Sequence, residues 1–156
     1  MDDKSMLVEA VGLCKRFGRV RAVDGVTLAV PKGETLCIIG PNGAGKTTLL
    51  LLLGGVLLPS AGHVHVFGMH RWKQNFDIRQ RSTFLTAQPL FGACPTPYEY
   101  LRFLAQIYKV PKATFVERLQ QMAGEMHLTS HLRKPWHKLS LGMMKKVGLV
   151  AAFLPD

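Results

Sequence analysis

One stretch of the chain combines glycines, a lysine and threonines in a spacing that suits phosphate binding. It consists of Gly40, Pro41, Asn42, Gly43, Ala44, Gly45, Lys46, Thr47 and Thr48. The residues from Gly40 to Thr47 fit the pattern G-x-x-x-x-G-K-[ST] in full. Glycines allow positive φ angles and close backbone approach, so that successive N–H groups can converge on phosphate oxygens. The stretch therefore predicts a site for the phosphates of a nucleoside triphosphate, with ATP as the expected nucleotide.

Two side chains of this loop have expected roles. Lys46 should bridge the β- and γ-phosphates, and the Thr47 hydroxyl should ligate magnesium. A helix that starts near Gly45 adds about half a positive charge at its N-terminus, which attracts an anion. The expected cofactors are therefore ATP and Mg²⁺.

The motif requires a strand before the loop and a helix after it, and the sequence predicts both. Residues 35–39 (TLCII) form a short apolar run, typical of a strand buried on both faces. A leucine-rich helix is expected from Gly45 to about Leu53, because two glycines and then Pro59 follow it. Four further strands are expected, at residues 5–11, 20–30, 62–67 and 82–87.

The second half of the chain has the pattern of helices. Thr96 is expected to cap a helix, with Pro97 at its first position and Glu99 placed to complete a capping box. Three more helices are expected, starting at Pro111, within residues 128–132, and at Ser140 or Leu141.

The order of these motifs resembles the ATP-binding cassette family, the ATPase subunits of ABC transporters. The resemblance covers nearly the whole chain, and its opening segments are Ala22–Leu28, Pro31–Glu34 and the run GPNGAGKTTLL from Gly40. It implies an α/β fold: a P-loop NTPase core with an N-terminal antiparallel β subdomain and a helical signature subdomain, incomplete at its C-terminal end. The implied divisions are residues 1–92 for the β subdomain and phosphate-loop core, 93–139 for the helical subdomain and 140–156 for the signature helix.

The resemblance also implies roles for four residues outside the loop. Phe17 matches an aromatic residue that stacks on adenine, and the less favoured alternative by residue type is packing in a core or hairpin. Gln88 matches a glutamine that contacts magnesium and water and couples to the membrane partner. Ser140 and Gly142 match signature residues that contact the γ-phosphate bound by a second subunit.

The signature itself departs from the usual family sequence. Residues 139–143 read L-S-L-G-M, where the family usually has L-S-G-G-Q. The third and fifth positions therefore differ, in a way that resembles some exporter-type cassettes. This variant implies export as the direction of transport.

The family continues beyond the signature helix with an apolar strand that ends in Asp-Glu, and later with a histidine. No apolar run in this sequence ends in Asp-Glu, and only residues 143–156 follow Gly142. We therefore expect a fragment or a truncated reading frame, which binds nucleotide with little or no hydrolysis by itself.

Composition limits the partners. Lysine and arginine number 20 against 10 acidic residues, giving a formal net charge of +10. Such an excess suits binding to a nucleotide, a nucleic acid or an anionic membrane surface, or it is simply a solvated basic surface.

The longest apolar run, Leu49–Leu58, is shorter than the roughly 20 residues that span a bilayer. Three separated cysteines without disulfide or zinc spacing fit a reducing, cytosolic setting.

The resemblance implies two partners, a membrane-spanning transporter subunit and a second ATP-binding subunit, at the cytoplasmic face of the cell membrane. Two other functions stay open: a truncated nucleotide-binding module without hydrolysis, and a soluble cassette ATPase acting on nucleic acid. His63 and His65 share one strand face, but they lack a third ligand at a suitable spacing. A solvated strand is therefore expected there in preference to a metal site.

Overall fold

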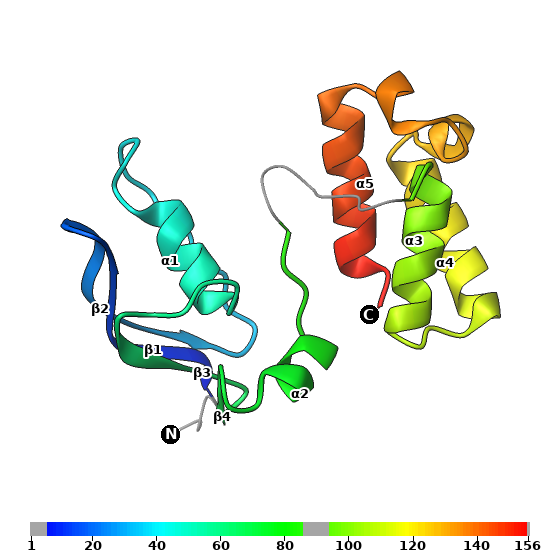
Figure 1. Ribbon diagram of the computed structural model, residues 1–156. Coiled ribbons are helices and arrows are strands. Elements are labelled where there is room, and N and C mark those ends of the chain that lie inside the picture. Colours follow the sequence, from blue (N-terminus) through cyan, green and yellow to red (C-terminus); the bar gives the residue numbers. More distant parts are fainter. Residues whose placement is uncertain (1–5, 86–93, 156) are drawn as a thin grey trace. The chain divides into compact units, whose positions relative to one another are not determined.

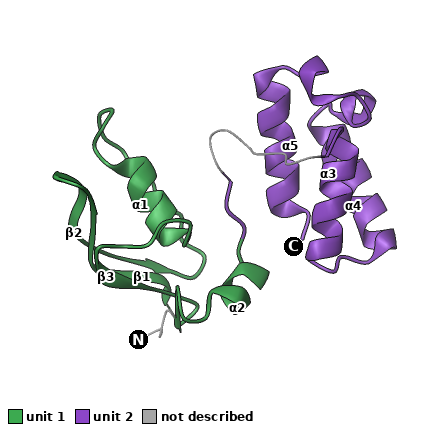
Figure 2. Cartoon of the chain, viewed as in Figure 1, with its two compact units in different colours: residues 1–82 green, residues 83–156 purple. Residues whose placement is uncertain are grey.

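The computed structural model describes residues 6–85 and 94–155. The chain forms two compact units, Met1–Ser82 and Thr83–Asp156, called here the first and second units (Figure 2). Gln88 and the last two residues of the strand expected at 82–87 lie outside the described residues.

The first unit is built on an antiparallel sheet with the strand order β2-β1-β3-β4 (Figure 1). Its strands are β1 (Met6–Phe17), β2 (Val20–Pro31), β3 (Ala61–Val66) and β4 (Met69–His70). Strands β1 and β2 form a hairpin whose turn includes Gly18, with a φ of 57°. The strands expected at 5–11, 20–30 and 62–67 are thus present, although β1 continues through Phe17.

Helix α1 (Lys46–Leu53) covers one face of this sheet (Figure 1). It begins directly after Gly45, as the sequence predicts, and buries Leu49 and Leu52. The same core includes residues from β1, β2 and β3 and from α2 (Asn75–Gln80). Its buried members are Ala10, Leu13, Val23, Leu49, Leu52, Val64, Val66 and Ile78. Helix α2 and β4 are too short for their periodicity to be recognised in the sequence.

The prediction of a buried strand at residues 35–39 is wrong for this structure. The segment is irregular, and its side chains are largely exposed, with Ile39 at 88% and Leu36 at 47%. A strand buried on both faces needs hydrogen-bonded neighbours and covering helices. Among the described residues no strand pairs with this segment. Residues 82–85, also expected as a strand, are irregular as well.

The second unit is helical. It contains α3 (Pro97–Ile107), α4 (Lys112–Glu125), the short 3₁₀ helices η1 (Thr129–His131) and η2 (Trp136–Lys138), and α5 (Leu141–Phe153). Buried residues from α3, α4 and α5 share one core. Its members are Leu101, Ala105, Phe115, Leu119, Ala123, Leu128, Leu132, Leu139, Val147, Val150, Ala151 and Leu154. The helix starts expected at Pro97, Pro111 and Ser140 or Leu141 are confirmed, and the short helix expected near 128–132 is η1.

Helix α3 begins with a variant of the expected capping box. The Glu99 N–H donates to the Thr96 Oγ1 at 3.3 Å, and the Thr96 hydroxyl donates to the Glu99 Oε2 at 2.8 Å. The carboxylate therefore accepts from the Thr96 side chain, whereas a full capping box would use the Thr96 backbone N–H. Pro97 occupies the first helical position, where its missing N–H costs nothing.

Candidate nucleotide-binding site

The phosphate loop adopts its conformation through glycines. Gly43 and Gly45 have φ angles of 82° and 84°, in the left-handed region that favours glycine. The Ala44 N–H donates to the Pro41 carbonyl oxygen at 3.3 Å, which closes a turn inside the loop. Gly45 is the N-cap of α1, and its carbonyl accepts the first helical hydrogen bond, from the Leu49 N–H at 2.8 Å. The loop therefore leads directly into the helix N-terminus.

Gly45 also fixes the loop against strand β2. A Cβ atom at this position would lie 2.0 Å from the carbonyl oxygen of Ala22 and 3.7 Å from the Val23 Cγ2. Only a residue without a side chain allows the two backbones to come this close. The close approach places the loop beside the first residues of β2, next to the β1–β2 turn.

Phe17 lies on the same hairpin. It pairs with Val20, and Arg16 pairs with Arg21, the residue before Ala22. The Phe17 ring is half exposed, and the Lys15 Nζ lies 5.2 Å from the ring centroid. The hairpin thus presents an accessible aromatic face a few residues from the strand segment that the phosphate loop touches. Its stacking on adenine stays a prediction.

Replacing Phe17 with alanine is expected to weaken ATP binding about tenfold, because base–aromatic stacking contributes about 1–3 kcal/mol. Titration calorimetry would measure this change. Tripolyphosphate has no base, so its affinity should stay unchanged in the same variant. A Phe17→Trp variant should retain ATP affinity. An equal loss for ATP and tripolyphosphate would show that Phe17 acts through the fold and not through stacking.

The Lys46 side chain folds back over the loop that precedes it. Its Nζ donates to the carbonyl oxygens of Gly40 at 2.8 Å and Pro41 at 2.6 Å. An ammonium group has three N–H donors, so one remains for a phosphate oxygen. The two carbonyls therefore hold the positive charge at the mouth of the loop.

The N-terminus of α1 has the features of an anion and magnesium site. Its first turn carries no acidic residue that would compete with a phosphate. Thr47 is exposed, and within residues 6–85 and 94–155 its hydroxyl makes no hydrogen bond. Its oxygen is thus available to a hard cation such as Mg²⁺, which prefers oxygen ligands. The residues present fit a magnesium–triphosphate complex.

One buried residue that supports this helix was missed by the sequence analysis. Arg71, only 3% exposed, reaches the C-terminal end of α1. Its Nε donates to the Leu53 carbonyl at 3.3 Å, one terminal nitrogen donates to the Gly54 carbonyl, and the other donates to the Asn75 Oδ1 at 2.8 Å. A cation here satisfies helix carbonyls that lack partners and interacts favourably with the helix dipole.

The Arg71 guanidinium is shielded from water and closely packed against the backbone. Burial, and then the positive charge of Arg79, lower the pKa of its guanidinium. Gly55, with a φ of 67°, lies against it, and a Cβ there would fall 2.5 Å from the guanidinium carbon. No local pattern indicates such a contact, because the arginine and the carbonyls that it binds are 17 and 18 residues apart.

Replacing Arg71 with methionine is expected to destabilise the first unit by about 2 kcal/mol, because the partly buried carbonyls of Leu53 and Gly54 lose their partner and an unpaired buried polar group costs about 1–3 kcal/mol. Methionine keeps much of the apolar volume, so the change isolates the hydrogen bonds. Urea unfolding followed by circular dichroism would measure it. Arg79→Met is the matched control and should be neutral, because Arg79 is exposed. Equal stability of Arg71→Met and the parent chain would contradict the helix-capping role.

The signature residues lie at the start of α5 in the second unit. Ser140 is the N-cap, and its Oγ accepts a hydrogen bond from the Met143 N–H at 3.2 Å. Its hydroxyl hydrogen is left to donate to an external oxygen. A Cβ at Gly142 would lie 3.9 Å from the Ser140 Oγ, so this glycine leaves the helix end open. Ser140 and Gly142 therefore lie together at the start of α5. The phosphate-loop residues, Gly40 to Thr48, lie together in the first unit at the start of α1.

The histidines of β3 pack as aromatic rings. His63 and His65 lie edge to face with ring centroids 5.2 Å apart, and His65 and His70 have centroids 5.4 Å apart. Across the described part of the chain, no three His, Cys, Asp or Glu side chains are grouped as a metal ion would require. The same residues include no helix that is both long and apolar enough to cross a membrane.

The glycine loop, the capped helix behind it and the adjoining hairpin define a phosphate-loop nucleotide-binding protein. The family model described as ABC transporter matches residues 23–156. That match covers most of the sequence, so the chain belongs to the ABC transporter family. ATP-binding subunits of this family hydrolyse ATP.

Individual relatives agree with this assignment. The chain is 31% identical over 150 residues to the bacitracin transport ATP-binding protein BcrA of Bacillus licheniformis, covering 96% of this chain and 48% of that protein. It is 36% identical over 141 residues to the cobalt import ATP-binding protein CbiO of Rhodobacter capsulatus, covering 86% and 50%. The chain thus spans about half the length of these curated relatives.

A solved structure, titled "Structure of ATP binding subunit of ABC transporter", superposes with a TM-score of 0.86 at 29% identity. The superposition covers 96% of this chain and 62% of that one. The expected fold class, a P-loop ATPase of the ABC type with an antiparallel β subdomain and a helical subdomain, is confirmed by these matches.

Proposed function

We propose that this chain is the nucleotide-binding part of the ATP-binding subunit of an ABC transporter, and that it binds ATP with Mg²⁺ at the loop from Gly40 to Thr48. The observation that carries the proposal is the loop itself. Gly43 and Gly45 hold it in a left-handed conformation, α1 begins behind it, and Lys46 lies over its mouth.

Each residue of the site has a physical role in this proposal. Backbone N–H groups of the loop and of the first turn of α1 point at the phosphates, and the helix dipole adds positive potential. Lys46 neutralises charge on the β- and γ-phosphates, and Thr47 donates an oxygen ligand to the metal. Bound Mg²⁺ would offset the charge that develops on the phosphate oxygens. Phe17 holds the adenine, and Gln88 is proposed as a further magnesium and water contact.

ATP hydrolysis is proposed for the complete protein. Positioning and electrostatic stabilisation carry phosphoryl transfer, and they need a group that orients the attacking water. The sequence contains no apolar run ending in Asp-Glu to provide one. We therefore expect the purified chain to bind ATP and to release little or no phosphate. Phosphate release at a rate normal for the family would contradict this division of roles.

The proposed partners are a second ATP-binding subunit and a membrane-spanning subunit, at the cytoplasmic face of the membrane. Ser140 and Gly142 form an open helix N-terminus, which suits the γ-phosphate held by a second subunit. ATP-dependent association of the chain in analytical ultracentrifugation, lost in a Ser140→Arg variant, would support the paired arrangement. A sedimentation coefficient that ATP does not change would contradict it.

Export is proposed as the direction of transport. It rests on the L-S-L-G-M signature alone, since the relatives named above include an import protein at 36% identity. Deletion of the encoding gene should then sensitise cells to a compound that the transporter removes. A deletion that instead lowers uptake of a nutrient would contradict export.

A nucleotide series tests the binding proposal directly. In titrations of the purified chain, affinity should fall steeply from ATP and ADP to AMP, because the loop recognises the β- and γ-phosphates. Removal of Mg²⁺ by a chelator should weaken ATP binding further. Equal affinities for ATP and AMP would overturn the assignment of the loop as the phosphate site.

A further inference from the structure

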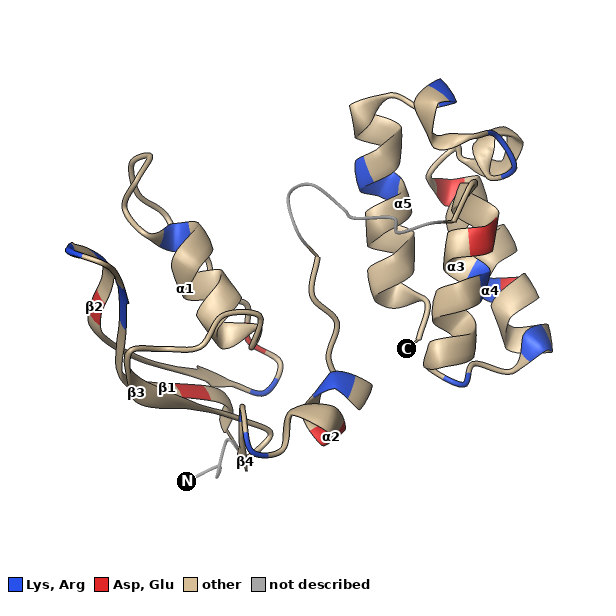
Figure 3. Ribbon diagram, viewed as in Figure 1, with Lys and Arg blue, Asp and Glu red and all other residues tan. Residues whose placement is uncertain are grey.

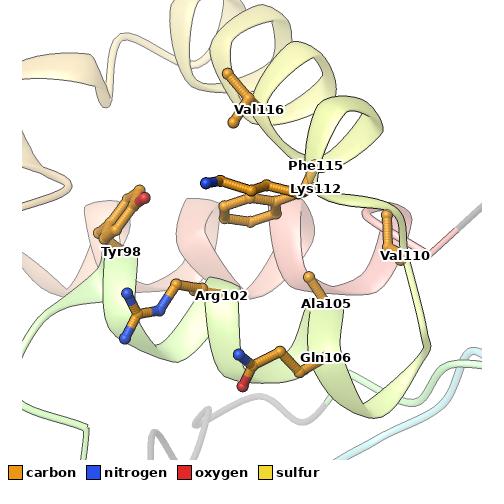
Figure 4. Close-up of a pocket in the computed structure, with 8 residues that line it drawn as sticks. All are labelled: Tyr98, Arg102, Ala105, Gln106, Val110, Lys112, Phe115 and Val116. Atoms are coloured by element: carbon orange, nitrogen blue, oxygen red, sulfur yellow. The ribbon is translucent and has the colours of Figure 1, made fainter.

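A cavity of about 520 Å³ lies between helices α3 and α4 of the second unit (Figure 4). This volume is within the range of roughly 300–1,000 Å³ that small-molecule sites occupy. The lining has an apolar part, formed by the buried Ala105 and Phe115 together with Val110 and Val116. Its polar part is formed by Tyr98, Arg102, Gln106 and Lys112.

Three of the four polar groups lie at one side of the cavity. In Figure 4 the Lys112 ammonium, the Arg102 guanidinium and the Tyr98 hydroxyl lie on the same side of the Phe115 ring. The Tyr98 and Phe115 rings are 6.1 Å apart, centroid to centroid. The guanidinium carbon of Arg133 lies over the Tyr98 ring, 5.2 Å from its centroid. An apolar wall thus adjoins a cluster of hydrogen-bond donors.

The cations of this cluster lack a counterion. Lys and Arg occur on several elements of both units (Figure 3), but here Arg102 and Lys112 both line one cavity. Within residues 94–155 and 6–85 neither makes a hydrogen bond or an ion pair. The Glu99 carboxylate, one turn before Arg102 on α3, already accepts from the Thr96 hydroxyl. The described residues that line the cavity include no aspartate or glutamate.

The N-terminus of α4 adds positive potential at the cavity. Lys112 is the first residue of this 14-residue helix, and the first turn carries no acidic residue. The partial positive charge of unpaired N–H groups at a helix N-terminus favours an anion. A helix N-terminus by itself does not indicate a binding site. Here it adjoins a cavity of ligand size that Arg102 and Lys112 line, and among the residues that the structure describes neither of these cations forms an ion pair.

We propose that this cavity binds a small organic carboxylate with an apolar body. The carboxylate lies between Arg102 and Lys112, because the guanidinium fork matches a planar carboxylate and the ammonium supplies a second charge-assisted hydrogen bond. The apolar body packs on Val110 and on the exposed Val116. An inorganic anion would leave that apolar wall exposed to water, so it should bind more weakly.

Three probes distinguish the contribution of charge to binding from that of apolar contact. They are phenylacetate, the neutral phenylacetamide and inorganic phosphate. Each is titrated into the full chain while amide shifts are followed by NMR. Phenylacetate should shift residues of α3 and the start of α4 in a saturable way, with an affinity at least about tenfold above that of phenylacetamide, since one charge-assisted hydrogen bond contributes that much. Phosphate should bind these helices more weakly than phenylacetate.

Exposed variants complete the test without disturbing the core. Arg102→Gln and Lys112→Gln should each weaken phenylacetate binding about tenfold. Val116→Glu should weaken it as well, because it adds a carboxylate to the wall. Lys145→Gln, which removes an exposed cation from α5, should have no effect. Equal affinities for phenylacetate and phenylacetamide, or unchanged binding in Arg102→Gln and Lys112→Gln, would overturn the proposal.

Discussion

Replacing Lys46 with alanine is expected to weaken MgATP binding by about ten- to a hundredfold, because the charge-assisted hydrogen bond of its remaining N–H to a phosphate oxygen, worth about 1.5–3 kcal/mol, is lost. The Lys46 Nζ is already held at the mouth of the loop by the carbonyl oxygens of Gly40 and Pro41. ATP therefore meets a positive charge that needs little reorganisation, and this placement makes the loss large. Titration calorimetry with MgATP would measure the change.

The matched control is Lys73→Ala. Lys73 is exposed in the first unit and, in the described part of the chain, it makes no hydrogen bond or ion pair. Removing it changes the net charge by the same amount as Lys46→Ala, so general electrostatic attraction is held constant between the two variants. ATP affinity should stay near the parent value in Lys73→Ala. Similar losses in both variants would mean that overall charge, and not the loop, governs binding.

The sequence predicts the conformation of the phosphate loop and the start of α1 because both are local. The glycine spacing, Lys46 and the helix that follows are all contained in residues 40–53, and each depends mainly on its neighbours. The caps of α3 and α5 are local in the same sense, since Thr96 and Ser140 each bond to an N–H three residues ahead. Features of this kind follow from backbone conformation and side-chain type alone.

The features that the sequence did not predict are non-local. Residues 35–39 have the composition of a buried strand, but a strand forms only where another strand pairs with it. Arg71 binds carbonyls at the far end of α1, and nothing near it in the sequence indicates that contact. The roles of Gln88, Ser140 and Gly142 depend on partners elsewhere, so they remain predictions.

Replacing Gly45 with alanine is expected to destabilise the first unit by about 2–5 kcal/mol, the sum of about 1–2 kcal/mol for a strained left-handed residue and about 1–3 kcal/mol for an overpacked contact. The strain comes from its φ of 84°, which an alanine adopts only at a cost. The overpacking comes from β2, where the new Cβ would fall 2.0 Å from the Ala22 carbonyl oxygen. Backbone atoms cannot move aside as a flexible side chain can, so the loop and strand would have to separate.

Gly43→Ala is the control that separates these two costs. Gly43 has nearly the same φ, 82°, but a Cβ there would meet nothing within 4 Å. Alanine at Gly43 should therefore cost only the strain, about 1–2 kcal/mol. Urea unfolding of both variants without nucleotide, followed by circular dichroism, measures the difference. A larger loss for Gly45→Ala means that the loop is held by its contact with β2, whereas equal losses would mean that backbone strain alone makes this glycine necessary.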